Sequence, residues 1–286
     1  MKRMDSFSRA VAAIALSSLV LTWASAAAER FPATSTGSTG HGMAAMENAA
    51  RGGKYLFVYF WKQNDQQTQS MYGVFQTATQ AMPEAAHAIS VNIGDLKEQP
   101  LVDRFDVSRA PMPLVLAIAP NGAVTKGIPI SFTEQQLREA FVSRGTAQCL
   151  KALQNRKLVL LCVHSQASRV APASFQGVRE FVADARFANS TEVVAVDATD
   201  QSEAGFLQSL QVDPRRTDAV AVLLAPPGQP VAKFTSAVTK DQIVARVSAS
   251  SSECCPGGKC EPGQQCGPGQ QCAPGQKCGP NGCRKQ

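Results

Sequence analysis

Lys54-Tyr-Leu-Phe-Val-Tyr-Phe-Trp61 is an apolar stretch whose pattern returns 103 residues later in Lys157-Leu-Val-Leu-Leu-Cys-Val-His164. Each stretch is short, contains no turn residue, and consists mostly of aromatic, β-branched or large aliphatic side chains. A run of this kind predicts a strand that is buried on both faces of a sheet. Two such strands with the same flanking lysine indicate an internal duplication.

Further matches follow the two strands at slightly larger offsets of 105 and 106 residues. Ser90–Asp95 matches Ala195–Asp200, Pro113–Gly122 matches Ala219–Gly228, and Thr133–Leu137 matches Thr239–Ile243. Insertions in the loops between two copies of one fold produce a slow drift of this kind. The sequence therefore predicts two similar folded units in tandem.

Periodicity and turn residues predict the order β-α-β-α-β-β-α in each unit. In the first unit we expect strands at 55–61, 88–93, 114–119 and 123–127, and helices at 44–50, 66–82, 96–105 and from the cap Thr133 to a stop at Gly145. A βαβ crossover makes its two strands parallel, and the late hairpin adds antiparallel strands to the same sheet. The predicted fold class is α/β.

Residues 54–144 resemble a thioredoxin-like domain in this order of elements, and 157–248 resemble a second, more divergent copy. In that family a strand ending in Phe-Trp precedes a Cys-x-x-Cys at the start of a helix, whose N-terminus stabilises a thiolate. Counting from Phe60-Trp61, the two cysteine positions fall on Asp65 and Thr68. Neither side chain has a thiol, so neither takes part in thiol-disulfide exchange. Asp65 is predicted to be a helix N-cap instead.

The same resemblance implies a cis-proline just before the third strand, facing the site. Pro113, preceded by Met112, has this position and is expected to help hold an extended peptide. The second unit has Ala219 there, and His164 stands at the position of Trp61. No catalytic residue is assigned. The degenerate site is predicted to consist of Trp61, Asp65, Thr68 and Pro113.

Cys162 and His164 stand two apart on one predicted strand, so they share a face of the sheet. A Cys–His pair is able to activate a thiol. However, Cys162 lies inside an apolar run, where free cysteine behaves as a small hydrophobic residue, and we interpret it as part of the core. A Cys149–Cys162 disulfide is an alternative that an oxidising compartment leaves open.

The beginning of the chain has the pattern of a secretory signal peptide. Lys2, Arg3 and Arg9 precede the apolar run Val11–Trp23, and Ala24-Ser25-Ala26 is a small-residue cleavage site. The run has 13 residues, which is short of the roughly 20 that span a bilayer. We predict an exported protein, periplasmic or extracellular, with no membrane span in the mature chain. Its nine cysteines then lie where disulfides form.

Seven of these cysteines lie in the last 33 residues: Cys254, Cys255, Cys260, Cys266, Cys272, Cys278 and Cys283. From Cys260 the spacing is six residues over four cysteines, and each is followed by a Pro-Gly or Pro-Asn pair typical of a type II turn. Almost no apolar residue separates them, so thiol chemistry must order this tail if anything does.

Three interpretations of the tail compete. Thiolates suit a soft ion such as Cu(I) or Zn(II), which repeated turns would surround with sulfur. Disulfides within the tail or between chains are the second interpretation; with seven cysteines, one thiol is left free or pairs with Cys149, Cys162 or another chain, which allows a disulfide-linked oligomer. The third is a disordered appendage with incidental cysteines. The regular spacing favours the first two.

Composition agrees with this organisation. The chain is 44% hydrophobic and 17% charged, enough for real cores, and a net charge of +6 is too mild to indicate a nucleic-acid binder. Phosphate-loop, HExxH and GxSxG motifs are absent. We predict a signal peptide over 1–26, a flexible leader over 27–42, thioredoxin-like domains over 43–145 and 146–250, and a Cys/Pro/Gly-rich, low-complexity tail over 251–286.

These features lead to one hypothesis with two alternatives. The chain is expected to be an exported, non-catalytic thioredoxin-fold scaffold that binds an unidentified protein or peptide of the cell envelope around Trp61 and Pro113, while its tail binds a soft metal ion or forms cross-links. The first alternative is a thiol-disulfide oxidoreductase or chaperone that uses tail cysteines in place of the lost pair. The second is a structural protein of the envelope, joined into multimers through the tail.

Overall fold

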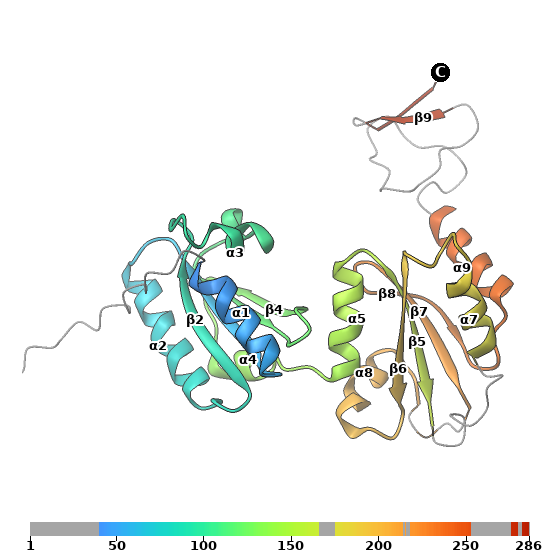
Figure 1. Cartoon of the computed structure of the whole chain (residues 1–286), viewed down its shortest axis with the longest axis horizontal. Helices are drawn as coiled ribbons and strands as arrows, with labels where there is room; N and C mark the ends of the chain where they lie inside the picture. The colour runs from blue at the N-terminus through green and yellow to red at the C-terminus, as the bar shows by residue number, and fades with distance from the viewer. Residues whose placement is uncertain are drawn as a thin grey trace, which may run out of the picture. The chain divides into compact units, whose positions relative to one another are not determined.

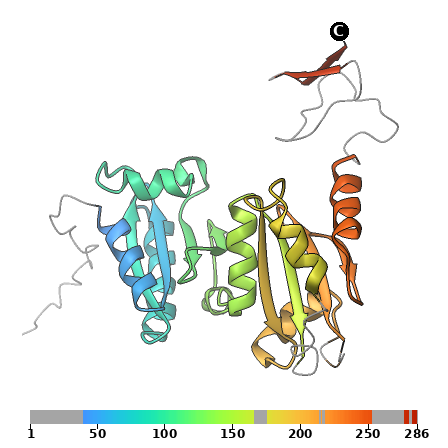
Figure 2. The same cartoon turned by 45° about the vertical axis from the view of Figure 1, so that its right-hand side comes forward.

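The structure, a computed structural model, describes residues 40–165, 175–213, 215, 218–252, 276–279 and 282–285. Its strands form two four-stranded sheets and one two-stranded hairpin. Helices cover both faces of each four-stranded sheet, as the two views of Figures 1 and 2 show. Among the described residues, no helix has the length and apolarity needed to cross a membrane.

The first sheet has the strand order β2-β1-β3-β4. The strands β1 and β2 are parallel, whereas β3 is antiparallel to both β1 and β4. This module consists of α1 (His41–Arg51), β1 (Tyr55–Trp61), α2 (Gln66–Gln80), β2 (Ala86–Asn92), α3 (Gln99–Arg104), a 3-10 turn (Val107–Arg109), β3 (Leu114–Ile118), β4 (Val124–Pro129) and α4 (Glu134–Arg138).

The second sheet repeats this topology in the order β6-β5-β7-β8, with β5 parallel to β6 and antiparallel to β7. This module consists of α5 (Arg144–Gln154), β5 (Leu158–His164), α7 (Gln176–Ala183), β6 (Thr191–Asp197), a 3-10 turn (Gln201–Glu203), α8 (Ala204–Ser209), β7 (Val220–Ala225), β8 (Gln229–Phe234) and α9 (Lys240–Ser252). The chain therefore has two thioredoxin-like α/β modules, each a crossover followed by a hairpin. The terminal hairpin is β9 (Gln276–Gly279) and β10 (Gly282–Lys285).

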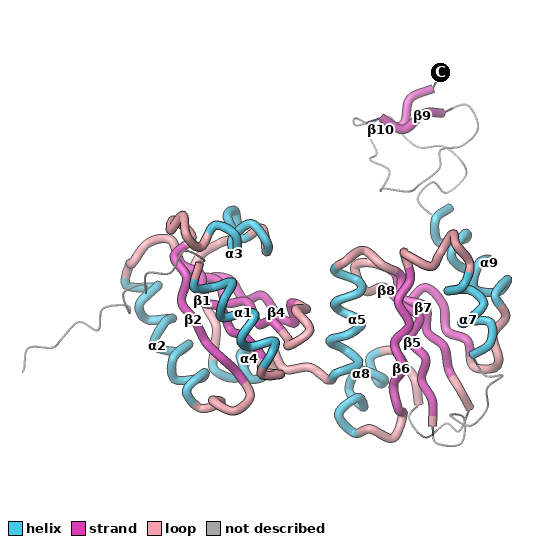
Figure 3. The backbone as a smooth tube through the Cα atoms, in the orientation of Figure 1, coloured by secondary structure: helices cyan, strands magenta, loops and turns pink. Residues whose placement is uncertain are grey.

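The uninterrupted apolar runs exist because both faces of each central strand are covered. Along β1, Leu56, Val58 and Phe60 pack in one cluster with α1 and α3. Phe57 and Tyr59 point to the opposite face and pack with α2 and α4. The layers are therefore helix, sheet and helix, with the strands in the middle (Figure 3). The four strands predicted for the first unit are present, with ends that differ by at most two residues.

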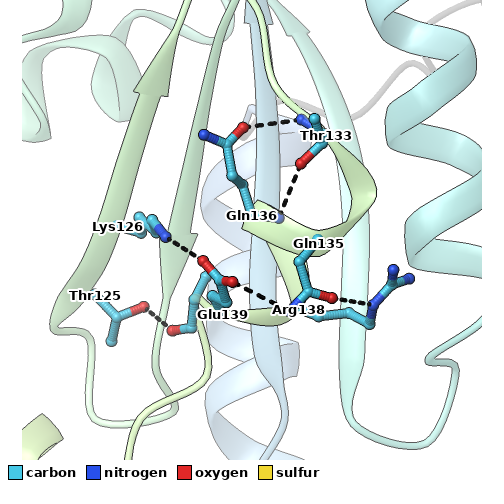
Figure 4. A network of polar contacts seen from close by, with 8 residues as sticks. Thr125, Lys126, Thr133, Gln135, Gln136, Arg138 and Glu139 are labelled. Atoms are coloured by element: carbon cyan, nitrogen blue, oxygen red, sulfur yellow. Dashed lines mark hydrogen bonds and ion pairs between the residues drawn. The ribbon is translucent and has the colours of Figure 1, made fainter.

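The predicted helix from Thr133 to Gly145 is wrong in its second half. Thr133 does cap α4, through a capping box with Gln136 (Figure 4). The helix nevertheless ends at Arg138, because side chains of the sheet bind the next backbone groups: Thr125 Oγ1 donates to Ala140 O at 2.7 Å, and the Tyr55 hydroxyl binds both Val142 N and O.

Gly145 is an interior residue of α5 rather than a stop. Ser143 is the N-cap of this helix, and its hydroxyl accepts a hydrogen bond from Thr146 N at 3.2 Å. Gly145 N donates to Glu203 Oε1 at 2.7 Å. The first helix of the second module therefore begins before the predicted domain boundary at 145/146.

The flexible leader predicted over 27–42 also ends earlier than expected. The helix α1 begins at His41, whose side chain is exposed. Gly42 is buried, and its N–H donates to Glu98 Oε2 at 2.9 Å. A partner distant in sequence thus orders residues whose composition resembles that of a linker.

Candidate functional site

The residues predicted for the degenerate site gather at one edge of the first sheet. The strand β1 ends at Trp61, β3 begins directly after Pro113, and β4 ends at Pro129. The register joins Phe60 to Leu114 and Leu114 to Pro129, so these ends are neighbours. The Met112–Pro113 peptide bond is cis, the geometry that the sequence predicts.

The start of α2 shows what replaces the reactive cysteines. Asp65 is the N-cap, and its Oδ1 accepts a hydrogen bond from Thr68 N at 2.8 Å. Hydrogen bonds from Thr68 lower the pKa of the Asp65 carboxyl. Thr68 is buried, and its carbonyl accepts a hydrogen bond from the Tyr59 hydroxyl at 2.6 Å. The positive end of the helix thus stabilises a carboxylate, and this position holds no thiol.

Trp61 is held at the end of β1 by a neighbour on β2. Its indole Nε1 donates to Ser90 Oγ at 3.0 Å, and its half-buried ring packs against the cluster beneath α2. Trp61 and Pro113 therefore lie at one edge of the sheet, and four residues separate the end of β1 from the start of α2. Of the four residues of the degenerate site, Asp65 is exposed and Trp61 half-buried, whereas Thr68 and Pro113 are buried.

Two exposed apolar side chains, which the sequence analysis did not single out, belong to this same edge. Leu96 is 85% exposed in the loop after β2, and Ile130 is 47% exposed directly after β4. Because β1, β2 and β4 end at this edge and β3 begins there, both lie on the side of the sheet that carries Pro113. We call Trp61, Leu96, Met112 and Ile130 the apolar edge.

Ile130 has a backbone conformation that is rare for its residue type. Its φ is 69°, in the left-handed region that β-branched residues avoid. Two contacts hold it there: Ile130 N donates to Pro113 O at 2.7 Å, and Gln67 Nε2 donates to Ile130 O at 3.3 Å. The surrounding structure thus imposes a strained conformation that leaves an apolar side chain half exposed.

The equivalent edge of the second module has a different chemistry. His164 ends β5 opposite Asp197 of β6, and Ala219 replaces the cis-proline. His164 Nδ1 is buried and has no hydrogen-bond partner among the described residues. Burial raises the pKa of the Cys162 thiol to about 12, so at neutral pH it is protonated and is a poor nucleophile. The interpretation of Cys162 as a core residue agrees with this burial.

A Cys149–Cys162 disulfide is excluded by the sheet that separates the two residues. Both are buried free thiols. Cys149 packs with Val159, Leu161 and Val163 on one face of β5, whereas Cys162 packs with Leu160 on the other. Burial raises the pKa of Cys149 to about 12 as well. Successive side chains of β5 point to opposite faces of the sheet, and α5, which contains Cys149, covers the face opposite to the one on which Cys162 lies.

Two buried glutamates are further features that the sequence analysis missed. Glu98 is 3% exposed and binds Gly42 N; Glu203 is 4% exposed and binds Gly145 N and Ser143 Oγ. Both carboxylates therefore cap the first helix of their module. The sequence spacing could have indicated both glutamates. They are 105 residues apart and the glycines that they bind are 103 apart, the same offsets that relate the strands of the two modules.

A cavity of about 250 Å³ lies against α5 and β6, away from the apolar edge. Lys151, Lys157, Glu192 and Val194 are among its lining residues. Lys157 Nζ and Glu192 Oε2 are 3.0 Å apart. Because these two charges compensate each other, we assign no ligand to this cavity.

The predicted tail site is described only at its end. Cys278 and Cys283 lie on β9 and β10, whereas Cys254, Cys255, Cys260, Cys266 and Cys272 lie outside the described residues. Within the described part of the chain, no group of three or more His, Cys, Asp or Glu side chains is placed to hold a metal ion. The backbone register sets Cys278 directly opposite Cys283.

Comparison with known proteins finds similarity in structure alone. No protein-family model matches the chain, and no curated protein matches its sequence. A disulfide isomerase from Xylella fastidiosa Temecula1 is 14% identical, with a TM-score of 0.29 over 35% of this chain and 80% of that one. Thioredoxin O2 from Arabidopsis thaliana is 14% identical, with a TM-score of 0.29 over 36% and 85%. Human ERp44 is 10% identical, with a TM-score of 0.34 over 78% and 59%. The strand order of each module, a parallel crossover followed by an antiparallel hairpin, makes the fold of this chain thioredoxin-like.

Proposed function

We propose that this chain is an exported, non-catalytic thioredoxin-fold scaffold that binds extended apolar segments of partner proteins at its apolar edge. The tail adds a second function, in which its cysteines bind a soft metal ion, Cu(I) or Zn(II), or form cross-links. The N-terminal pattern supports export to the periplasm or the extracellular space, which would bring the tail into an oxidising compartment.

One observation carries the proposal for the edge. The two positions where the fold places reactive thiols hold an N-cap carboxylate, Asp65, and a buried hydroxyl, Thr68. The cis-proline and an exposed apolar surface remain beside them. These two positions therefore offer no thiol for redox chemistry, and the exposed apolar residues beside them support a binding site without turnover.

The strain at Ile130 supports the same function. Backbone strain of this kind costs on the order of 1–3 kcal/mol and persists where the surrounding contacts impose it, often at functional sites. Here the contacts with Pro113 and Gln67 impose it, and the side chain that it presents is apolar. An apolar segment of a partner would bury Leu96 and Ile130, which are otherwise left in water.

Replacing Ile130 with asparagine tests the edge without damage to the fold. Asparagine tolerates a positive φ, so we expect Ile130→Asn to raise the free energy of unfolding by about 0.5–1 kcal/mol. Loss of the apolar side chain that a bound segment would bury is expected to weaken binding by about tenfold. The probe is a reduced and carboxymethylated, permanently unfolded protein, and binding is measured by fluorescence anisotropy.

Val193→Asn is the matched control, because Val193 is also an exposed apolar residue (42%) but lies on β6 of the second module. It is expected to leave binding unchanged. Equal affinities of the two variants for the unfolded probe would remove the apolar edge as the binding surface.

The tail is tested by comparing the mature chain, purified from its own compartment, with a version that ends at Glu253. We expect copper or zinc in elemental analysis, or oxidised thiols in a thiol count, to be lost with the tail, and neither protein to reduce insulin. A tail that contains no metal and whose seven cysteines all count as free thiols would remove its proposed role. Insulin reduction that depends on the tail would favour the hypothesis of a thiol-disulfide oxidoreductase over that of a scaffold. Tail-dependent multimers on non-reducing gels would instead favour a structural protein.

A further inference from the structure

We propose that Cys278 and Cys283 form a disulfide with each other, which closes the C-terminal hairpin. This proposal rests on the cross-linking branch of the proposed function and assigns a specific pair within the tail. The strands β9 and β10 are antiparallel, and their register pairs Gly279 with Gly282 and Cys278 with Cys283.

The backbone register meets the distance requirement of a disulfide. Directly opposite residues of an antiparallel pair have Cα atoms about 4.5 or 5.5 Å apart, depending on whether they exchange hydrogen bonds. Disulfides join residues whose Cα atoms are about 4.4–6.8 Å apart. Both kinds of cross-strand position therefore lie within the range, so the pairing requires no displacement of the backbone.

The spacing of the cysteines from 260 onward agrees with this pair. The cysteines at 260, 266, 272 and 278 follow one another at intervals of six residues, but the last interval, to Cys283, is five. An interval of five leaves four residues, Gly279-Pro280-Asn281-Gly282, of which the outer two are paired in the strands. Across a two-residue connection, an interval of six sets no two cysteines directly opposite. Among the cysteines from 260 onward, only the last two therefore have the spacing of this hairpin. Cys255 and Cys260 are also five residues apart but lie outside the described residues.

Formation of the bond requires an oxidant, for which we propose a small disulfide such as oxidised glutathione. One cysteine thiolate attacks a sulfur of this disulfide and releases one thiol. The second cysteine thiolate then attacks the resulting mixed disulfide and releases the other thiol. The two cysteine thiols lose two protons and two electrons in total, and the oxidant gains both as two thiols.

Trypsin separates the tail cysteines in a way that makes this pairing measurable. Lys277 and Arg284 flank a peptide, 278–284, that contains Cys278 and Cys283 and no other cysteine. The full-length protein is oxidised with oxidised glutathione, alkylated under denaturing conditions without reductant, digested and examined by mass spectrometry. We expect most of peptide 278–284 to carry no alkyl group and to be lighter than its reduced form by the mass of two hydrogen atoms.

Two variants of the full chain complete the test. Cys283→Ser is expected to leave Cys278 alkylated, glutathionylated or linked elsewhere, whereas Cys272→Ser, the matched control, is expected to leave peptide 278–284 internally linked. Double alkylation of this peptide in the oxidised wild-type chain would overturn the pairing, and so would a link to the peptide 260–277. Metal lost with the tail together with double alkylation would retain the proposed function and remove only this disulfide.

Discussion

Gly177→Ala is expected to lower the free energy of unfolding of the second module by about 3 kcal/mol or more, although it adds only one methyl group. Gly177 lies in the first turn of α7, and a Cβ there would stand 2.0 Å from Val238 O and 2.7 Å from Thr239 Cα. These atoms belong to the backbone before α9, so no side-chain rotation relieves the overlap. The helix must move away from this segment, which disturbs the cluster around Val178 and Phe181.

Gly73→Ala is the matched control, because it adds the same atom in the interior of α2, where a Cβ would meet nothing within 4 Å. We expect it to raise the free energy of unfolding by about 0.5–1 kcal/mol, since alanine loses less backbone entropy than glycine in a helix. Urea denaturation followed by circular dichroism measures both variants. Similar stability changes of the same sign would contradict the close approach of α7 to residues 238–239.

Glu203→Ala is expected to lower the free energy of unfolding by roughly 2–4 kcal/mol, because the buried Gly145 N loses its acceptor and the half-buried Ser143 Oγ loses one of its partners. Gly145 N and Ser143 Oγ both donate to this carboxylate at the start of α5. Glu98→Ala, at the equivalent position of the first module, removes the acceptor of one donor, Gly42 N, and is expected to cost less. The order of the two losses follows from the number of donors that the carboxylate binds, two at Glu203 and one at Glu98.

Glu180→Ala is the control for these glutamates, because its side chain is exposed and accepts a hydrogen bond from the neighbouring, exposed Gln176. Its effect on the free energy of unfolding is expected to stay within about 0.5 kcal/mol. Chemical denaturation measures the three variants under one set of conditions. A loss at Glu203 no larger than that at Glu180 would contradict its role as the buried cap of α5.

The sheets were predictable because burial of a central strand is encoded locally. The strand β1 matches its predicted bounds of 55–61, and the antiparallel hairpin follows from the turn at 120–122. Helix ends were less predictable, because α4 ends where Thr125 and Tyr55, on other strands, bind its following backbone. A local pattern contains no information about such distant competitors for a carbonyl or an N–H group.

The candidate site also has features that the sequence predicts and features that only the structure reveals. The loss of the thiols and the position of Pro113 are readable from the residue types themselves, as is the role of Asp65 as a cap. The exposure of Leu96 and Ile130 is not readable from the sequence, because both are ordinary apolar residues there. Only the packing of the sheet leaves them in contact with water. The positive φ of Ile130 likewise follows from its contacts with Pro113 and Gln67 rather than from its own preference.

The sequence by itself determined the repeated order of elements, the topology of each module and the absence of thiols from the degenerate site, since these depend on residue type and spacing. Only the tertiary structure decided which face of a strand each cysteine occupies, so that Cys149 and Cys162 are kept apart. It also decided that Glu98 and Glu203 are buried caps and that Cys278 faces Cys283 in register. The physical reason is that hydrophobic periodicity specifies which residues are buried, whereas the partner of a buried polar group or thiol depends on segments that meet only in the folded chain.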